Sequence, residues 1–220
     1  MSYRKRIKFF LVHTLRVSNK EADELIQSGK LKVNGNVVQE NIFFEETDEI
    51  LLGEKTLQKG FEYLYIRFYK PRGYQSTLSE NVSDNLSQFF KQFQNVAIAG
   101  RLDKESEGLL LISNNCNWIR DVTDPDSKKE KEYLVDLDRE PDDDFFSKFR
   151  GGVELKFYTT RTAMCDKVGP TQIRVVLTEG KNRQIRKMCK TLGYNVLKLK
   201  RIRIDQFKLG NLKEGELDLT

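Results

Sequence analysis

The sequence contains few of the residues that build disulfide frameworks, histidine sites or rigid turns. Its 220 residues include three cysteines, one histidine and four prolines. Cys116, Cys165 and Cys189 are odd in number and far apart, which excludes a disulfide framework and a Cys-x-x-Cys metal site. His13 alone cannot form a histidine-rich metal site, and histidine-dependent catalysis could use only this residue. We therefore expect reduced thiols, no metal, and chemistry carried by a carboxylate.

Long apolar runs are also missing. No stretch approaches the ~20 residues that span a bilayer, and the start Met1-Ser-Tyr-Arg-Lys-Arg6 lacks the apolar region of a signal peptide. We expect a soluble, cytoplasmic protein without a membrane partner. Its length and its 38% hydrophobic content predict one larger domain and one small one. The net charge of +5 moderately favours binding to polyanionic partners.

Residues 1–55 predict a small domain of two helices and a hairpin. Apolar residues recur at i, i+3, i+4 and i+8 from Ile7, the stripe of an amphipathic helix. Ser18 and Glu21 have the spacing of a capping box, and Gly29 supplies the end of this second helix. Asn34-Gly35 between β-branched residues favours a type I′ hairpin turn. The charged and polar stretch 45–60 predicts a linker.

Residues 60–220 predict a second domain of the α+β class. Short β-rich runs indicate strands, and apolar residues at helical spacing indicate helices. The expected strands are 63–68, 109–112, 133–137, 153–157 and 172–177, and the expected helices are 83–93, 141–150 and the segment up to Gly193.

The stretch 98–115 contains a charged, turn-prone segment between two apolar runs. It reads Ile-Ala-Gly-Arg-Leu-Asp-Lys-Glu-Ser-Glu-Gly-Leu-Leu-Leu-Ile-Ser-Asn-Asn, and its run Leu109–Ile112 is typical of a buried strand. Arg101 and Asp103 should therefore lie at a rigid rim that a ligand can reach. From the residues alone, an Asp that caps the turn or pairs with Arg101 is the more common role.

The segment from Lys181 to Ile204 contains nine basic residues and no acidic one. Such a segment suits a nucleic-acid backbone. Its helix should bury one face and present four cations on another, namely Arg183, Arg186, Lys187 and Lys190. The acids of 136–144 should point away from the nucleic acid; at a helix start they serve the helix dipole more often than a metal.

These motifs together resemble a known family. Residues 100–111 are similar to the motif G-R-L-D-x-x-(S/T)-x-G-L-L-L of bacterial ribosomal RNA pseudouridine synthases, of the ribosomal small-subunit pseudouridine synthase A type. The similarity extends to Lys70-Pro71-Arg72-Gly73, to Lys131-Glu132-Tyr133 and to residues 179–188. Residues 18–35 resemble the S4 RNA-binding domain. The resemblance implies a mixed, largely antiparallel sheet with flanking helices, preceded by an S4 module.

The resemblance also implies roles for individual residues. Asp103 would attack or deprotonate the ribose of a target uridine, and Tyr133 would stack on the flipped base. The family's arginine falls on Arg186, which we expect, rather than Arg183, to keep Asp103 ionised. Leu177 and Ile185 would wall the pocket. The residues expected to contact RNA are Arg16, Lys20, Lys30, Lys32, Lys70, Arg72, Arg101, Arg183, Lys187 and Lys190.

The expected function is therefore isomerisation of uridine to pseudouridine in structured RNA. Ribosomal RNA is the first choice of substrate and tRNA the second. Net isomerisation needs neither energy nor redox equivalents, and no phosphate loop or dinucleotide fingerprint is present, so no cofactor is expected. We expect a monomer. The alternatives are a non-catalytic RNA-binding or ribosome-assembly protein and a DNA-binding protein that uses the basic helix.

Overall fold

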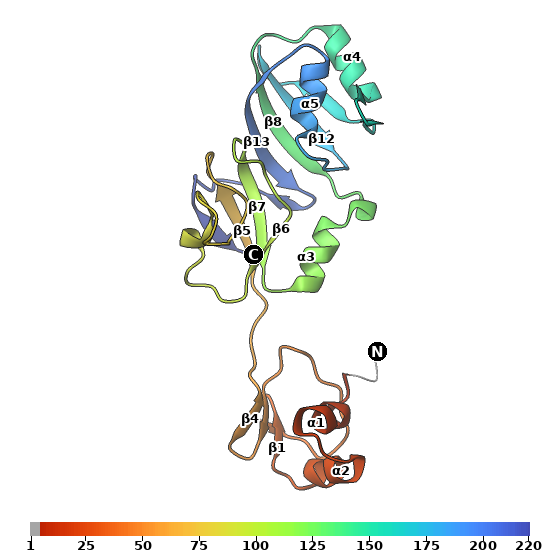
Figure 1. Cartoon of the computed structure of the whole chain (residues 1–220), viewed down its shortest axis with the longest axis vertical. Helices are drawn as coiled ribbons and strands as arrows, with labels where there is room; N and C mark the ends of the chain where they lie inside the picture. Colours follow the sequence, from red (N-terminus) through yellow and green to blue (C-terminus); the bar gives the residue numbers. More distant parts are fainter. Residues whose placement is uncertain (1–4) are drawn as a thin grey trace. The chain divides into compact units, whose positions relative to one another are not determined.

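The computed structural model describes residues 5–220 as two compact units, the first ending at Tyr63 and the second covering Leu64–Thr220 (Figure 1). The first unit packs two helices against an antiparallel sheet with the strand order β2-β1-β3-β4. Its elements are α1 (Ile7–Leu15), α2 (Asn19–Gln27), β1 (Leu31–Val33), β2 (Asn36–Val37), β3 (Ile50–Leu52) and β4 (Lys55–Gln58).

Local chemistry fixes the elements of this first unit. The Glu21 amide donates to Ser18 Oγ at 3.2 Å, and the Ser18 amide donates to Glu21 Oε2 at 2.7 Å. Both backbone φ angles of Asn34 and Gly35 are positive, 49° and 79°, as a type I′ turn requires. The two helices, the capping box and the hairpin predicted from the sequence are confirmed.

The stretch predicted as a linker, 45–60, is instead a hairpin of the first unit. Strands β3 and β4 pair in it, and β3 also pairs with β1. The Gln58 side chain donates to the carbonyl oxygens of Glu45, Glu46 and Asp48. The polar residues that suggested a linker are the exposed side of a sheet edge, so the prediction was wrong here. The structure divides the chain between Tyr63 and Leu64.

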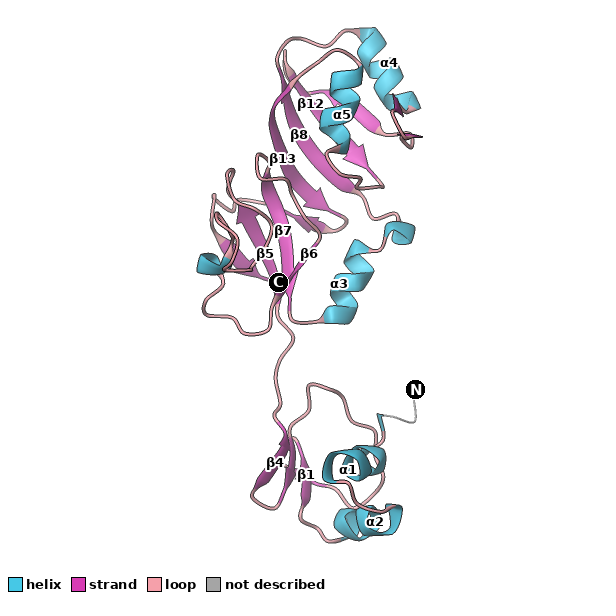
Figure 2. Cartoon of the chain, in the orientation of Figure 1, coloured by secondary structure: helices cyan, strands magenta, loops and turns pink. Residues whose placement is uncertain are grey.

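The second unit is built on one long mixed sheet with the order β11-β12-β8-β13-β7-β5-β15 (Figure 2). Strands β13 and β7 run parallel, and the other pairs of this sheet are antiparallel. The sheet consists of β5 (Tyr65–Lys70), β6 (Ala97–Ala99), β7 (Glu107–Ser113), β8 (Lys131–Leu137), β11 (Met164–Lys167), β12 (Gln172–Leu177), β13 (Val196–Ile204), β14 (Phe207–Lys208) and β15 (Leu217–Leu219). The α+β class and the largely antiparallel sheet are confirmed.

Three helices and a small hairpin flank this sheet. Helix α3 contacts β6 and β7, α4 contacts β11, and α5 contacts β13 and β9. Their bounds are Cys116–Thr123 for α3, Asp143–Gly151 for α4 and Gln184–Thr191 for α5; the hairpin joins β9 (Glu154–Leu155) to β10 (Tyr158–Thr159). Helix α4 was predicted at 141–150, and Asp142 caps it by accepting a hydrogen bond from the Phe145 amide at 2.8 Å.

Strand β7 lies in the middle of the sheet, and all seven of its residues are buried. This explains the continuous apolar run that predicted a strand at Leu109–Ile112. Gly108 has a φ of +104°, and a Cβ added there would lie 2.2 Å from the Arg201 carbonyl oxygen. Only glycine lets β7 and β13 approach this closely.

The helix predicted at 83–93 is absent; this stretch contains only a 3-10 turn over Ser87–Phe89. Asp84 has a left-handed φ of 52°. The Asn85 side chain accepts a hydrogen bond from the Ser87 amide and donates to the Val82 carbonyl. These local bonds compete with a helix. The spaced apolar residues of this stretch are nevertheless core residues, because Leu86 and Phe90 are buried in the core.

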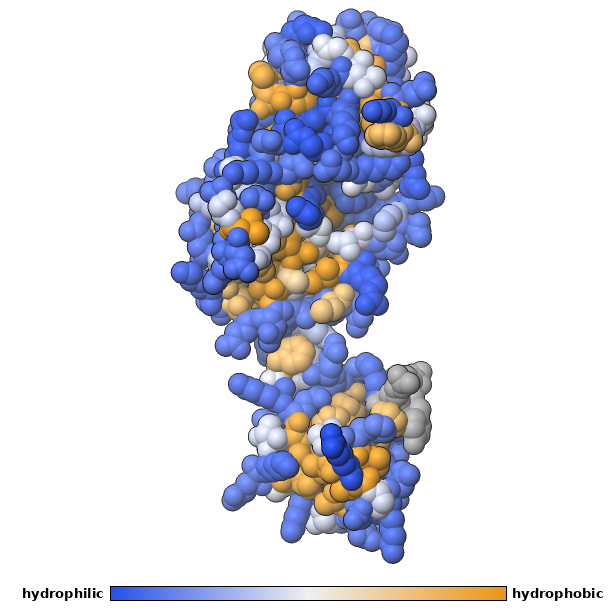
Figure 3. Space-filling model, viewed as in Figure 1, coloured by the Kyte–Doolittle hydropathy of each residue, from blue (hydrophilic) through white to orange (hydrophobic). Residues whose placement is uncertain are grey.

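Hydrophilic side chains cover most of the second unit's face in the view of Figure 3. Within residues 5–220, no helix is both long and apolar enough to cross a membrane. In the same range, no cluster of three or more His, Cys, Asp or Glu side chains has the arrangement of a metal site.

Candidate active site

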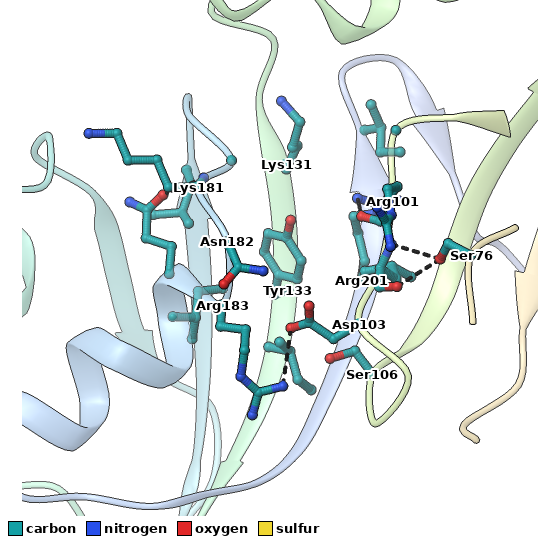
Figure 4. Close-up of a pocket in the computed structure, with 18 of the residues that line it drawn as sticks. Ser76, Arg101, Asp103, Ser106, Lys131, Tyr133, Lys181, Asn182, Arg183 and Arg201 are labelled. Carbon is teal, nitrogen blue, oxygen red and sulfur yellow. Dashed lines mark hydrogen bonds and ion pairs between the residues drawn. The ribbon is translucent and has the colours of Figure 1, made fainter. Parts of the chain in front are cut away.

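The site is a pocket of about 660 Å³ in the second unit, between the loop 100–106 and the segment 178–183 (Figure 4). The first loop joins β6 to β7, and the second joins β12 to α5. Side chains of β8 and β13 also line it, among them Tyr133 and Arg201. The pocket brings together six of the residues singled out from the sequence: Arg101, Asp103, Tyr133, Leu177, Arg183 and Ile185.

The loop that carries Asp103 is held by buried hydrogen bonds. The Leu102 amide donates to Ser76 Oγ at 2.9 Å, and the Ser76 hydroxyl donates to the Leu102 carbonyl at 2.7 Å. Lys70 Nζ donates to the Ser106 carbonyl at 2.7 Å. The Ser106 amide closes the turn on the Asp103 carbonyl at 3.0 Å. Asp103 therefore stands on a loop fixed on both sides, which preorganises its carboxylate.

The cation nearest the Asp103 carboxylate is Arg183. Its Nη1 lies 3.9 Å from Asp103 Oδ2 and 2.6 Å from Glu105 Oε2. The hydrogen bond from Arg183 lowers the pKa of Glu105. Because the Asp103 side chain is only 26% exposed, this ion pair is screened less than a surface pair.

Arg186, expected from the family resemblance to keep Asp103 ionised, contacts other groups. Its Nη1 donates to the Val196 carbonyl at 3.0 Å, and its Nη2 lies 3.3 Å from the Glu105 carbonyl and from Ser106 Oγ. Arg183 comes immediately before α5 and has a left-handed backbone conformation. Its side chain therefore lies with the pocket loop. Arg186 lies about one turn farther along, within the helix. Arg186 thus braces the residues next to Asp103, and burial lowers its pKa. A catalytic role for Arg186 stays a prediction.

Tyr133 lies on β8 and is 8% exposed. Figure 4 shows its ring above the Asp103 carboxylate in the same pocket. Leu177 and Ile185 are buried and line the pocket with it. The carboxylate, the aromatic ring and the apolar wall are therefore in one place.

Lys70, expected to contact RNA, is completely buried. Its Nζ donates to the carbonyl oxygens of Pro71 and Ser106 at 2.8 and 2.7 Å. Burial lowers its pKa from 10.5 to about 8. A phosphate cannot reach this ammonium group, so the prediction was wrong, and Lys70 is a support of the Asp103 loop. Its neighbour Arg72 is exposed.

The predicted helix face of four cations is only partly present. Arg183 lies outside α5, and Arg186 is half-buried. The remaining residues expected to contact RNA are exposed in their own unit: Lys187, Lys190 and Arg101 in the second, and Arg16, Lys20, Lys30 and Lys32 in the first.

The pocket residues that were not singled out from the sequence include two cations, Arg201 and Lys131. Arg201 is 3% exposed, although it stands in a run of basic residues, and nothing in that run separates it from its neighbours. Lys131 lies in the motif Lys131-Glu132-Tyr133, and burial, followed by the nearby Arg201 charge, lowers its pKa. A strand with one buried and several accessible cations cannot be recognised from composition.

Comparison with known proteins agrees with this geometry. Residues 64–191 match the sequence model of the family described as RNA pseudouridylate synthase. An uncharacterized RNA pseudouridine synthase of Aquifex aeolicus is 34% identical over 96% of this chain and 90% of its own length. The ribosomal large subunit pseudouridine synthase B of Bacillus subtilis is 31% identical over 96% and 90%. A crystal structure of a pseudouridylate synthase covers 98% of this chain and 95% of its own, with a TM-score of 0.68 and 25% identity.

The shared fold and the relatives define an RNA-modifying isomerase. The chain belongs to the RNA pseudouridylate synthase family, so it is an enzyme that converts uridine in RNA to pseudouridine.

Proposed function

We propose that Asp103 acts on the ribose of the target uridine, that Tyr133 stacks on the flipped base, and that the substrate is structured ribosomal RNA. One observation carries this proposal most directly: the Asp103 carboxylate and the Tyr133 ring line the same pocket, and the loop bearing Asp103 is fixed by buried hydrogen bonds.

The reaction makes specific demands on such a pocket. The bond between C1′ of the ribose and N1 of the base breaks, the base turns, and C1′ bonds to C5. C5 then loses its proton and N1 gains one, so atoms and electrons balance without a cofactor. A stacked base must first leave the RNA helix, at a cost of a few kcal/mol. A pocket of about 660 Å³ is within the size range of small-molecule sites.

Four side chains divide this work. The Asp103 carboxylate attacks C1′ or removes a proton from the ribose. The Tyr133 ring offers a face to the pyrimidine, and base–aromatic stacking is worth about 1–3 kcal/mol. Its hydroxyl assists removal of the C5 proton. Arg183, whose Nη1 lies 3.9 Å from Asp103 Oδ2, pairs with the carboxylate, and Arg186 holds the backbone beside it.

The basic residues supply the contact with RNA. The first unit, with its capped helix and hairpin, acts as an S4-like RNA-binding domain through Arg16, Lys20, Lys30 and Lys32, all exposed. In the second unit Lys187 and Lys190 of α5 are exposed, and phosphate contacts of this kind position a protein without reading sequence. Ribosomal RNA is the preferred substrate because one relative is named for the large ribosomal subunit.

The test compares the wild-type chain with Asp103→Asn on unmodified transcripts of the small- and large-subunit ribosomal RNAs, labelled with tritium at uridine C5. Asp121→Asn is the matched control, because Asp121 is exposed on α3 and does not line the pocket. We expect tritium release by the wild type and the control. Asp103→Asn should release none and still bind the RNA.

Two outcomes would contradict the proposal in different ways. Isomerisation by Asp103→Asn at a rate comparable to the wild type would remove Asp103 from the chemistry. Release from tRNA transcripts but from neither ribosomal RNA would leave the chemistry intact and exclude the proposed substrate.

A further inference from the structure

Arg201 is a buried cation in the pocket that the roles proposed above leave without a function. Its Nε donates to the Leu109 carbonyl at 2.8 Å, and its Nη1 lies 3.4 Å from the Arg101 carbonyl. Its Nη2 is buried and has no hydrogen-bond acceptor within residues 5–220. Arg201 lines the pocket and is 3% exposed. The buried Arg201 guanidinium therefore has one donor, Nη2, that is free to bind a ligand in the pocket.

Among residues 5–220, the charge of Arg201 is also uncompensated by any ion pair. Within the described part of the chain, no Asp or Glu lies within ion-pair distance of its guanidinium. Its charged neighbours include two further buried or half-buried cations, Lys70 and Lys131, whose pKa values it lowers. A buried, unpaired charge is costly, and an apolar residue of similar volume is usually tolerated better. An unpaired cation at such a place is a candidate for function.

Arg201 lies next to Tyr133, on which the target uracil is proposed to stack. Arg201 on β13 is the register partner of Tyr133 on β8 in an antiparallel pair, and such partners have their side chains on the same face of the sheet. A uracil stacked on Tyr133 thus has the guanidinium beside its edge. Because arginine donates and does not accept hydrogen bonds, it recognises the O2 or O4 carbonyl of uracil and not the N3–H group.

We propose that Arg201 donates a hydrogen bond to a carbonyl oxygen of the flipped uracil and stabilises the negative charge that the base acquires when its bond to the ribose breaks. This inference rests on the proposed function. The electron pair of the C1′–N1 bond stays with the base and spreads over N1, O2 and O4. The pair then forms the C1′–C5 bond, after which the C5 proton is lost and N1 is protonated. Arg201 gives up no proton in these steps and acts as an oxyanion hole does.

The first experiment replaces Arg201 by Gln and measures single-turnover isomerisation with saturating enzyme on the ribosomal transcript that the wild type modifies. Loss of one such donor should slow the reaction by about 10²–10³-fold while RNA binding is retained. Arg203→Gln is the matched control, because Arg203 lies on the same strand, pairs with Glu130 and Glu132, and does not line the pocket. Turnover by Arg201→Gln equal to that of Arg203→Gln would overturn the inference.

The second experiment identifies the contact, since a merely structural arginine could also slow turnover. Target RNA is prepared with 2-thiouridine or 4-thiouridine at the modified position, because sulfur is a weak acceptor. The ratio of the rates on uridine and on one of the two thiouridines should be larger for the wild type than for Arg201→Gln. It should be the same for the wild type and Arg203→Gln. An equal ratio in the wild type and Arg201→Gln for both thiouridines would contradict the contact.

A third measurement uses the wild-type chain alone and so does not depend on the folding of a variant. RNA carrying 2-pyrimidinone, which lacks O4, or 4-pyrimidinone, which lacks O2, at the target position should differ in affinity. The RNA that lacks the accepting oxygen should bind about tenfold to hundredfold more weakly than uridine RNA. Equal affinity for all three would overturn the inference. If the wild type modifies no transcript, the proposed function fails and not this inference alone.

Discussion

Lys70 is a buried residue whose protonation depends on its place in the fold. Its pKa of about 8 in the folded chain lies below its ordinary value of 10.5. Between these pH values the unfolded chain binds more protons than the folded chain, so the contribution of Lys70 to the free energy of unfolding rises with pH. The cost of burying its charge is fully present below pH 8 and is lost as the pH rises toward 10.5.

We therefore expect the free energy of unfolding of the wild type, minus that of Lys70→Met, to rise with pH. The increase should be about 1 kcal/mol per pH unit between roughly pH 8 and pH 10. Urea unfolding of both proteins from about pH 7 upward measures it. Lys91→Met, at an exposed lysine, is the control for the loss of a lysine side chain. A constant difference for Lys70→Met would mean that Lys70 keeps its ordinary pKa.

Arg183 and Arg186 should separate catalysis from stability. Arg183 is 41% exposed, so Arg183→Gln should change the free energy of unfolding by no more than ~1 kcal/mol. It should lower turnover by at least about tenfold, because Asp103 loses its nearest cation. Arg186→Ala leaves carbonyl groups of Val196 and Glu105 without a donor and should destabilise the fold by about 1–3 kcal/mol. Thermal or urea unfolding, measured beside tritium release, distinguishes the two. Equal effects of both variants on stability would contradict this division.

Among individual residues, the sequence identified those that belong to a contiguous motif. Asp103 and Tyr133 were found through their motifs, and both line the pocket. The roles of Lys70 and Arg201 were not found, because burial of a cation depends on which strand covers it. Which of Arg183 and Arg186 lies within ion-pair distance of Asp103 depends on one left-handed residue at the start of α5, which no spacing rule predicts.

At the scale of the elements, the approach of β7 to β13 makes a sharp prediction. Gly108→Ala would place a Cβ 2.2 Å from a backbone oxygen of Arg201, at a φ of +104°. Because backbone atoms on both strands must move, we expect a loss of roughly 3 kcal/mol or more in the free energy of unfolding. Gly210→Ala, at a φ of +61° with open space around it, should cost only about 1 kcal/mol. Urea unfolding of both variants checks this prediction. Equal losses in the free energy of unfolding would show that the positive φ, and not the close approach of the strands, determines the cost.

The elements that were predicted correctly are those whose own residues fix them. Ser18 with Glu21 and Asn34 with Gly35 form their cap and turn from neighbouring atoms, and the fully buried β7 shows in its apolar run. The stretch 83–93 had helical spacing, but its backbone follows the Asp84 turn and the Asn85 side chain. The hairpin β3–β4 was missed because an exposed sheet edge and a linker have the same polar composition.

At the scale of the whole molecule, the two units have separate cores. The first is formed by Ile7, Leu11, Ala22, Ile26, Leu31, Val33, Val38 and Ile50. The large core of the second unit is drawn from residues 66–199. A chain in which each unit buries its own apolar residues should lose one unit without unfolding the other.

Removal of residues 1–63 should therefore leave a folded enzyme. We expect residues 64–220 to unfold cooperatively and to isomerise saturating RNA at a rate close to that of the full chain, because the pocket residues all lie in the second unit. Affinity for RNA should fall, and its dependence on salt should weaken, because the cations at Arg16, Lys20, Lys30 and Lys32 are gone.

A chain cut at residue 55 is the informative comparison, since it keeps most of β4 without its partner β3 and leaves Leu57 without the core that it packs against. It should be the less soluble of the two. If residues 64–220 aggregate while the longer fragment folds, the first unit supports the second, and the cores are not independent.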